Sequence, residues 1–267
     1  MSDPWLSIIG LGEDGLSGLS DASRSALDNA DLIFGGPRHL DLVDAGDRGR
    51  PWPVPFSIDP VLAARDRKVA VLASGDPFWH GAGGSLATHL APGEWVSYPV
   101  PSTFALVANH MAWRIEDSLC LGLHAAPFER LLPVLASNTQ LICTLRDGAA
   151  PAELAAWLTQ QGFGETQMAV MERLGGPNQR VRSARADAFD LDDVQAPVAV
   201  ALAAQGTPGI PRASGLPDDL FHHDGQITKR PIRALTLSAL APRAGELLWD
   251  IGGGSGSVSV EWCLAAR

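Results

Sequence analysis

Three glycine-centred turns carry the residue types that could hold a nucleotide-like ligand. They are Gly10-Leu-Gly12-Glu-Asp-Gly15, Ser74-Gly-Asp-Pro-Phe-Trp79 and Asp250-Ile-Gly252-Gly-Gly254-Ser-Gly256. Each follows a predicted strand, and ligands of α/β proteins bind where the carboxyl ends of strands open onto a crevice. Glycine lets backbone amides approach a ligand, and a nearby carboxylate can order those amides or accept a hydroxyl. The three turns are therefore the first candidates for ligand sites.

The first turn matches the G-x-G-x-x-G spacing of dinucleotide-binding proteins, but its context argues against that function. In such proteins the third glycine lies inside the helix that holds the pyrophosphate. Here Leu-Ser-Gly-Leu-Ser follows, and a helix is predicted to start only after Ser20. Glu13 and Asp14 would also stand inside the phosphate loop. We interpret the turn as a substrate-side loop that includes Gly12, with a plain structural turn as the alternative.

The second and third turns differ in how specific they are. Pro77 fixes the backbone after Gly75 and Asp76, which an ordinary tight turn would explain equally well. In the third, an acidic residue precedes alternate glycines, as in the D/E-x-G-x-G-x-G motif of Rossmann-type methyltransferases that use S-adenosylmethionine (SAM). A nicotinamide site would need a small residue at position 257, where Ser257 is a marginal substitute. The third turn therefore favours SAM.

The elements that must position these turns alternate between short apolar runs and Ala/Leu-rich stretches of helical length. This alternation is typical of α/β architecture with largely parallel strands. The predicted strands are Trp5–Gly10, Val69–Ser74, Trp95–Pro99, Leu119–Leu123, Gln140–Leu145, Gln167–Met171, Val198–Ala203 and Leu247–Ile251. The predicted helices are Asp21–Ala30, Ile58–Arg65, Gly84–Leu90, Thr103–Trp113, Pro127–Leu135, Ala152–Gln161 and Pro231–Leu240.

Composition narrows the class of protein. The chain has 267 residues, 46% of them hydrophobic, which is enough for one large domain or for one domain and part of another. Its net charge of −10 argues against nucleic acid and anionic membranes as partners. No apolar run approaches the roughly 18 residues needed to span a bilayer, and the N-terminus lacks an export signal. Three scattered cysteines fit a reducing compartment. We expect a soluble cytoplasmic protein.

A Gly/Pro-rich segment interrupts the pattern near residue 204. It contains Gln-Gly-Thr-Pro-Gly-Ile-Pro-Arg-Ala-Ser-Gly-Leu-Pro, which disfavours regular structure. The expected organisation is therefore a domain over residues 1–203, a linker over 204–225 and a second segment over 226–267.

Five motifs, taken in order, resemble the tetrapyrrole methylases. They are Ile8-Ile-Gly-Leu-Gly12, Phe34-Gly-Gly-Pro-Arg-His-Leu40, Ser74-Gly-Asp-Pro77, Pro99-Val-Pro-Ser-Thr103 and Met171-Glu-Arg-Leu-Gly-Gly-Pro177. The second and last point to the subfamily that methylates precorrin-6Y (precorrin-6B), or its cobalt counterpart, at C5 in cobalamin synthesis. The resemblance covers about residues 5–203. It implies a two-lobed α/β fold, with lobes of about 1–100 and 114–203, SAM as methyl donor, a tetrapyrrole substrate and a homo-oligomer.

The tail resembles the opening of the partner enzyme of the same step. The stretch from Asp224 through Lys229 to Ser259 is similar to enzymes that methylate C15 and remove the carboxyl group of the C12 acetate, and the two activities are often fused. The acidic residue that would hold the SAM ribose would lie beyond Arg267. We therefore expect residues 226–267 to be the truncated start of a Rossmann-like SAM methyltransferase domain that does not form a stable unit alone.

The resemblance also implies roles for individual residues. Donor-binding candidates are Gly75, Asp76, Pro77, Ser102, Thr103 and Met171 in the first domain, and Asp250, Gly252, Gly254 and Gly256 in the tail. Arg38 and His39 are the candidates for binding substrate carboxylates, because a guanidinium pairs bidentately with a carboxylate. Simpler interpretations remain open: Ser102 as a helix N-cap, and Arg38 with His39 as a solvated helix start.

Methyl transfer from a sulfonium needs alignment and a dry site rather than a covalent nucleophile. No catalytic residue or general base is therefore assigned, and Glu172, beside Arg173, is expected to be salt-bridged rather than to act in proton balance. His222 and His223 lack further ligands at suitable spacing, so no metal is expected. The alternatives are another tetrapyrrole methylase with a different ring-carbon specificity, or a non-catalytic SAM-binding subunit of a two-component enzyme.

Overall fold

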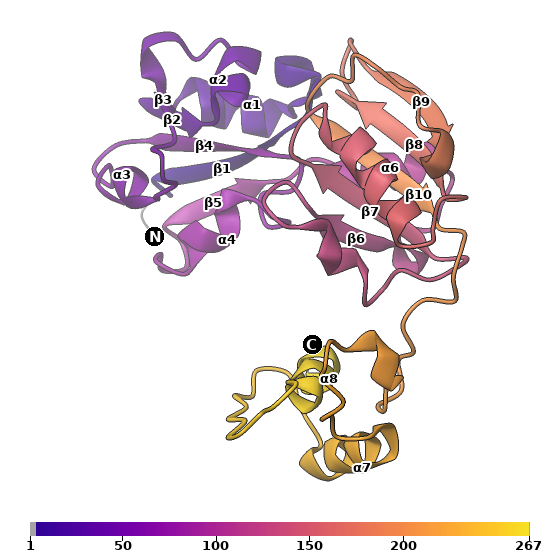
Figure 1. Ribbon diagram of the computed structural model, residues 1–267. Coiled ribbons are helices and arrows are strands. Elements are labelled where there is room, and N and C mark those ends of the chain that lie inside the picture. The colour runs from indigo at the N-terminus through magenta and orange to yellow at the C-terminus, as the bar shows by residue number, and fades with distance from the viewer. Residues whose placement is uncertain (1–3, 267) are drawn as a thin grey trace. The chain divides into compact units, whose positions relative to one another are not determined.

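The computed structural model describes residues 4–266 and divides into two compact units (Figure 1). The first comprises the described part of residues 1–127 together with 138–205, and contains both sheets. The second comprises residues 128–137 and the described residues from Gly206 onward. No helix among residues 4–266 is long and apolar enough to cross a membrane.

The first sheet of the first unit is parallel throughout. It consists of β1 (Leu6–Leu11), β2 (Leu32–Gly35), β3 (Gly49–Pro51), β4 (Val69–Ser74) and β5 (Trp95–Tyr98), in the order β3-β2-β4-β1-β5. Residue Leu11 at the end of β1 pairs with Ser74 at the end of β4. The chain leaves β1 toward one edge of the sheet and leaves β4 toward the other. The first two glycine turns therefore meet at a switch point, where parallel sheets open a crevice.

The two faces of this sheet are buried by alternate residues along each strand, as the period-2 geometry of a strand requires. Ile9 and Leu72 pack in one hydrophobic cluster, and Ile8 and Val71 in another. The helices of this half are α1 (Asp21–Asp28), α2 (Pro37–Leu42), α3 (Asp59–Leu62) and α4 (Ala82–Ala87). Ser20 caps α1 by accepting a hydrogen bond from the Ser23 amide, so this helix starts where the sequence predicted.

The second sheet is mixed. It consists of β6 (Leu119–Gly122), β7 (Gln140–Leu145), β8 (Gln167–Glu172), β9 (Arg180–Arg185) and β10 (Val198–Ala203), in the order β6-β7-β10-β8-β9. Only β6 and β7 pair in parallel; the other pairs are antiparallel. The expectation of largely parallel strands is thus wrong for this sheet. A turn of seven residues joins β8 to β9, which is too short for a parallel crossover.

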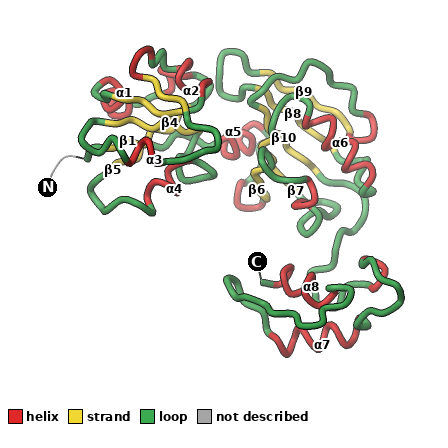
Figure 2. Tube along the Cα trace, turned by 60° about the vertical axis from the view of Figure 1, so that its left-hand side comes forward, coloured by secondary structure: helices red, strands yellow, loops and turns green. Residues whose placement is uncertain are grey.

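Two helices accompany the second sheet (Figure 2). Helix α5 (Thr103–His110) packs Phe104 and Val107 against β7, β8 and β10. Helix α6 (Ala150–Gln160) buries Leu154 and Leu158. Helix α5 begins after Ser102, whose Oγ accepts a hydrogen bond from the Ala105 amide. This cap and the packing of Phe104 in the core of the second sheet both hold the first turn of the helix in place.

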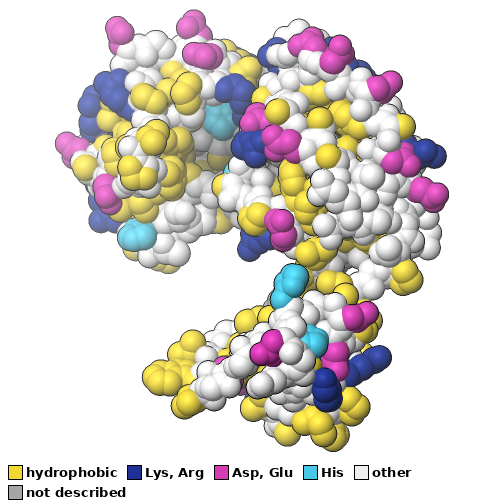
Figure 3. Space-filling model, viewed as in Figure 1, with side chains coloured by type: hydrophobic (Ala, Val, Ile, Leu, Met, Phe, Trp, Pro, Cys, Tyr) yellow, Lys and Arg dark blue, Asp and Glu magenta, His cyan; other side chains and the backbone are white. Residues whose placement is uncertain are grey.

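The second unit is helical, with α7 (Arg230–Leu240), α8 (Ser257–Ala265) and a short 3-10 helix at Asp218–Leu220. The strand predicted at Leu247–Ile251 is wrong, because these residues are irregular. A strand needs partner strands, and a single one is not stable in water. Figure 3 shows hydrophobic side chains at the surface of this unit. The large exposed ones are Ile232, Leu235, Leu240, Leu247, Trp249, Ile251 and Val260.

A buried ionic cluster holds the second unit together. Arg233 is fully buried and donates to Glu261 (2.7 Å) and to Asp218 (2.8 Å). The Glu261 carboxylate also accepts hydrogen bonds from the amides of Gly215 and Leu216. Helix α7, helix α8 and the segment before them are therefore joined through one pair of charged side chains.

Candidate active site

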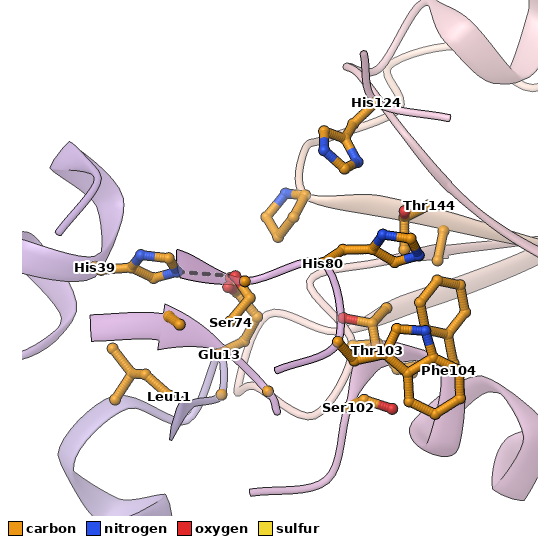
Figure 4. Close-up of a pocket in the computed structure, with 18 of the residues that line it drawn as sticks. Leu11, Glu13, His39, Ser74, His80, Ser102, Thr103, Phe104, His124 and Thr144 are labelled. Carbon is orange, nitrogen blue, oxygen red and sulfur yellow. Dashed lines mark hydrogen bonds between the residues drawn. The ribbon is translucent and has the colours of Figure 1, made fainter. Parts of the chain in front are cut away.

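A cavity of about 580 Å³ lies in the first unit, at the carboxyl ends of β1 and β4 (Figure 4). Residues from both sheets line it. Seven of the predicted site residues are among them: Gly12, Arg38, His39, Gly75, Ser102, Thr103 and Met171. Its volume lies in the range of ordinary small-molecule sites, about 300–1,000 Å³.

Close backbone contacts build the floor of this cavity. Gly75 has φ +62°, and a Cβ placed on it would lie 2.7 Å from the Cα of Ser102. A Cβ on Gly10 would collide with the carbonyl oxygen of Gly75. Ser102 is buried and caps α5 through the Ala105 amide, at 3.1 Å. Only glycine fits at Gly10 and Gly75, so the ends of β1 and β4 pack directly against neighbouring backbone beside the cavity.

Asp76 and Pro77 shape the turn behind Gly75 rather than line the cavity. The Asp76 carboxylate accepts a hydrogen bond from the Phe78 amide at 2.9 Å. This is the local Asx-type contact that stabilises a tight turn. The structure therefore places these two predicted residues beside the cavity, with a direct effect only on the turn.

Arg38 stands at one side of the cavity and is already paired. Its guanidinium donates to the Glu13 carboxylate, to Ser74 Oγ at 2.9 Å and toward His39 Nε2 at 2.8 Å. The side chain of Glu13 is 13% exposed and that of Arg38 is 37% exposed. Glu13 therefore compensates the charge of Arg38 where a substrate carboxylate would otherwise approach it.

His39 is held in its neutral form. Burial and the adjacent charge of Arg38 lower its pKa to about 4. Arginine only donates hydrogen bonds, so His39 Nε2 acts as an acceptor in this cluster, and it also lies 2.9 Å from Ser74 Oγ (Figure 4). The remaining ring proton is then on Nδ1, which is buried without a hydrogen-bond partner. His39 thus orders the cluster without adding a positive charge.

The turn between β8 and β9 fixes Glu13 from the other sheet. A Cβ on Gly176 would lie 2.6 Å from Cβ of Glu13, so the two backbones touch. Glu172 anchors this turn: it is 1% exposed and accepts from Arg180 (2.6 Å) and Arg182 (3.0 Å). Burial alone would raise the pKa of Glu172, but these hydrogen bonds lower it overall. Glu172 is thus salt-bridged as predicted, and its partners are Arg180 and Arg182.

Aromatic and imidazole side chains form the remaining walls. The ring centroids of Trp79 and Phe104 lie 5.1 Å apart, and His80 lies 6.0 Å from Phe104. His124, after β6, lines the same cavity. Sequence reasoning missed both histidines. The signal was faint: His80 follows the Ser-Gly-Asp-Pro turn by three residues, but nothing local indicates that His124 reaches the same space.

Comparison with known proteins identifies the family of this chain. Residues 6–190 match the family described as tetrapyrrole (corrin/porphyrin) methylases. The chain belongs to this family. Residues 219–267 match a second family, described as a precorrin methyltransferase domain.

Relatives of this tetrapyrrole methylase carry corrin names. It is 44% identical over 98% of its length to a precorrin-6Y C(5,15)-methyltransferase [decarboxylating] from Sinorhizobium sp, and covers 65% of that protein. It is 28% identical to the cobalt-precorrin-7 C(5)-methyltransferase of Salmonella typhimurium, over 70% of this chain and 94% of that one. It thus spans 65% of the length of the Sinorhizobium relative.

A solved structure shares the fold. The precorrin-6Y methylase of Archaeoglobus fulgidus superposes with a TM-score of 0.55 at 21% identity, covering 75% of this chain and 98% of that one. This agreement confirms the expected α/β methylase fold of the first unit.

The third glycine turn of this tetrapyrrole methylase belongs to the second unit and does not line the cavity. Asp250 is exposed and accepts a hydrogen bond from Ser259 Oγ. Gly252, Gly254 and Gly256 have φ between +56° and +78°, and a Cβ on Gly252 or Gly256 would meet nothing within 4 Å. The turn has the glycine conformations of its motif without the closely packed surroundings found at Gly75. Among residues 4–266, no group of three or more potential metal ligands occurs.

Proposed function

We propose that this chain transfers the methyl group of SAM to C5 of precorrin-6Y, or of its cobalt counterpart, in cobalamin synthesis. The observation that carries the proposal is the cavity at the β1 and β4 switch point, in a chain 44% identical to a precorrin-6Y C(5,15)-methyltransferase. Similarity to a C(5)-methyltransferase over 94% of that relative's length supports C5 as the position methylated.

The cavity suits SAM as the methyl donor. Gly75 lines the cavity with bare backbone, because a side chain there would collide with neighbouring main-chain atoms. Ser102 and Thr103 lie at the start of α5 beside it, and Met171 lines the same space from β8. We assign donor binding to these residues. When bound, SAM supplies an activated methyl group, so the protein contributes alignment, which can be worth roughly 7–11 kcal/mol.

The acceptor would lie against the aromatic walls. Trp52 and Phe56, with ring centroids 5.1 Å apart, line the cavity as Trp79 and Phe104 do. Flat apolar surfaces of this kind suit a conjugated macrocycle. Because Glu13 compensates the charge of Arg38, we propose that Arg38 and His39 orient the substrate near Gly12 through directed hydrogen bonds rather than through net charge.

Methylation of C15 and decarboxylation belong, in this proposal, to the domain whose family matches residues 219–267. Asp250, Gly252, Gly254 and Gly256 would then contribute to its SAM site. We propose that the protein forms a homo-oligomer. We also propose that it acts in the cytoplasm, which agrees with its three free cysteines.

The test is direct. The 267-residue chain is incubated with ¹³C-methyl-labelled SAM and, in parallel, with precorrin-6Y and cobalt-precorrin-7. NMR then locates the new methyl group. A label at C5 with either substrate supports the function, while a label at another meso carbon favours a tetrapyrrole methylase of different specificity. SAM binding without any turnover would favour a non-catalytic subunit.

A further inference from the structure

Methylation of a meso carbon that carries hydrogen requires a proton acceptor. The π electrons of the ring form the new C–C bond, and the pair of the broken C–S bond stays with sulfur. The C–H pair then restores conjugation, and the hydrogen leaves as a proton. Four side chains lining the cavity can accept one: Glu13, His39, His80 and His124.

Two of these four are already committed elsewhere. Glu13 accepts a hydrogen bond from the Arg38 guanidinium, and that pairing favours its charged, hydrogen-bonded state. His39 has its pKa lowered to about 4 by burial and by Arg38, which makes it a weak base at neutral pH. Neither is suited to hold the released proton.

The other two are free of such partners and lie together. Neither His80 nor His124 makes a hydrogen bond or an ion pair within residues 4–266. A Cβ built on Gly122 would lie 3.4 Å from Cδ2 and Nε2 of His80 and 3.4 Å from Cε1 of His124. The rings of His80, after β4 of the first sheet, and His124, after β6 of the second, therefore both lie next to Gly122.

His80 is distinguished by its backbone. Its φ of +59° lies in the left-handed region, where a side chain is disfavoured and glycine is not. Residues in such conformations concentrate at functional sites. The residue also follows the Gly75 turn directly, and Figure 4 shows its ring extending toward Thr144 above Phe104. The donor-side loop thus carries an imidazole into the acceptor side of the cavity.

We propose that His80 is the catalytic residue that accepts the proton from the methylated carbon. The inference rests on the proposed function, since the acceptor is needed only if a hydrogen-bearing ring carbon is methylated. The imidazole ring can accept the proton and pass it to solvent, because the side chain of His80 is exposed.

The test is His80→Gly in the 267-residue chain, because glycine suits this backbone conformation. We expect an unchanged or higher melting temperature and an affinity for S-adenosylhomocysteine within twofold of the original, measured by calorimetry. Single-turnover methyl transfer should fall about 100-fold or more, and added imidazole should restore at least a tenth of it. His124→Gln tests the neighbouring ring and should lower the rate less than His80→Gly does. His110→Gln, on the exposed end of α5, serves as the matched control.

Several results would overturn the inference. Full activity of His80→Gly would overturn it. A raised KM for the tetrapyrrole with an unchanged kcat would also do so, because it would indicate that His80 binds a substrate carboxylate. A large loss in His124→Gln with none in His80→Gly would assign the proton to the other ring. Absence of turnover by the unmodified chain would instead refute the proposed function, and this inference with it.

Discussion

Two glycine turns of this chain carry SAM-type motifs but stand in opposite surroundings. Gly75 ends a central strand of a five-stranded sheet and contacts the backbone of Ser102. Gly252 follows irregular chain in which Trp249 and Ile251 are 79% and 92% exposed. Both glycines have positive φ, so the local conformation is alike. The difference lies in the surroundings: a Cβ on Gly75 would meet the Ser102 backbone at 2.7 Å, while a Cβ on Gly252 would meet nothing within 4 Å.

The means of stabilisation also differ between the two regions. The first unit buries apolar residues on both faces of its first sheet, whereas the second combines a few buried apolar side chains, such as Leu216 and Leu237, with the buried Arg233 and Glu261 pair. A sheet distributes its stability over many contacts, while removing one partner of a buried ion pair leaves the other charge uncompensated in the interior.

The largest effect should follow from breaking the ion pair. Arg233→Met leaves Glu261 buried without its cation, which costs about 3–5 kcal/mol. We expect rapid proteolysis within residues 206–266, mapped by mass spectrometry, with S-adenosylhomocysteine binding retained. Arg230→Met, one turn earlier on α7 and exposed, is the control. If Arg233→Met resists protease as well as the original chain does, the Arg233 and Glu261 pair does not stabilise the second unit.

Removing a glycine from each turn should affect the two turns unequally. Gly75→Ala combines positive φ with a 2.7 Å backbone contact, so we expect a loss of about 3 kcal/mol in unfolding free energy and no measurable S-adenosylhomocysteine binding. Gly252→Ala has only the backbone cost, about 1 kcal/mol. Urea unfolding and calorimetry measure both variants, and equal effects would show that the two turns are equally constrained.

Acid should weaken the first unit through His39. Its pKa is about 4 when folded and 6.5 when free, so the unfolded chain takes up the proton first. The contribution to stability is therefore full above about pH 6.5 and is lost as the pH falls toward 4. Between pH 7 and pH 5 the loss should be about 2 kcal/mol. His39→Gln should flatten this slope in urea unfolding; an identical slope would place the titration elsewhere.

The smallest effect concerns the turn itself. Asp76→Ala removes the acceptor for the Phe78 amide, which should cost about 1 kcal/mol and weaken S-adenosylhomocysteine binding about fivefold. Asp76→Asn keeps an oxygen in place and should restore most of the affinity. If both variants bind normally, the turn is held by Gly75 and Pro77 alone.

The sequence predicted the elements whose signal is local. Apolar runs such as Val69–Ser74 and Val198–Ala203 form the strands expected of them. It missed β9, because Arg180 and Arg182 look solvent-exposed until Glu172 of the neighbouring strand is known to pair with them. It also missed α2, a helix of six residues after a Gly-Gly-Pro turn.

For the site, too, only the residues with a local sequence signal could be predicted. Motif residues that face the cavity by backbone geometry, such as Gly75 and Ser102, could be named from the sequence. Glu13, His80 and His124 could not, because their roles depend on contacts between the two sheets. The Gly176 contact with Glu13 joins residues 163 positions apart, and no local pattern records it.

The central claim is that the cavity of the first unit binds SAM, whether or not the Gly252 turn also contributes to a SAM site. Ultraviolet irradiation of the 267-residue chain with ³H-methyl-labelled SAM, followed by peptide mapping, tests it most directly. We predict label in peptides that contain Gly75, Thr103 or Met171, and competition by S-adenosylhomocysteine. Label confined to the peptide that spans Asp250 and Gly256 would contradict the account.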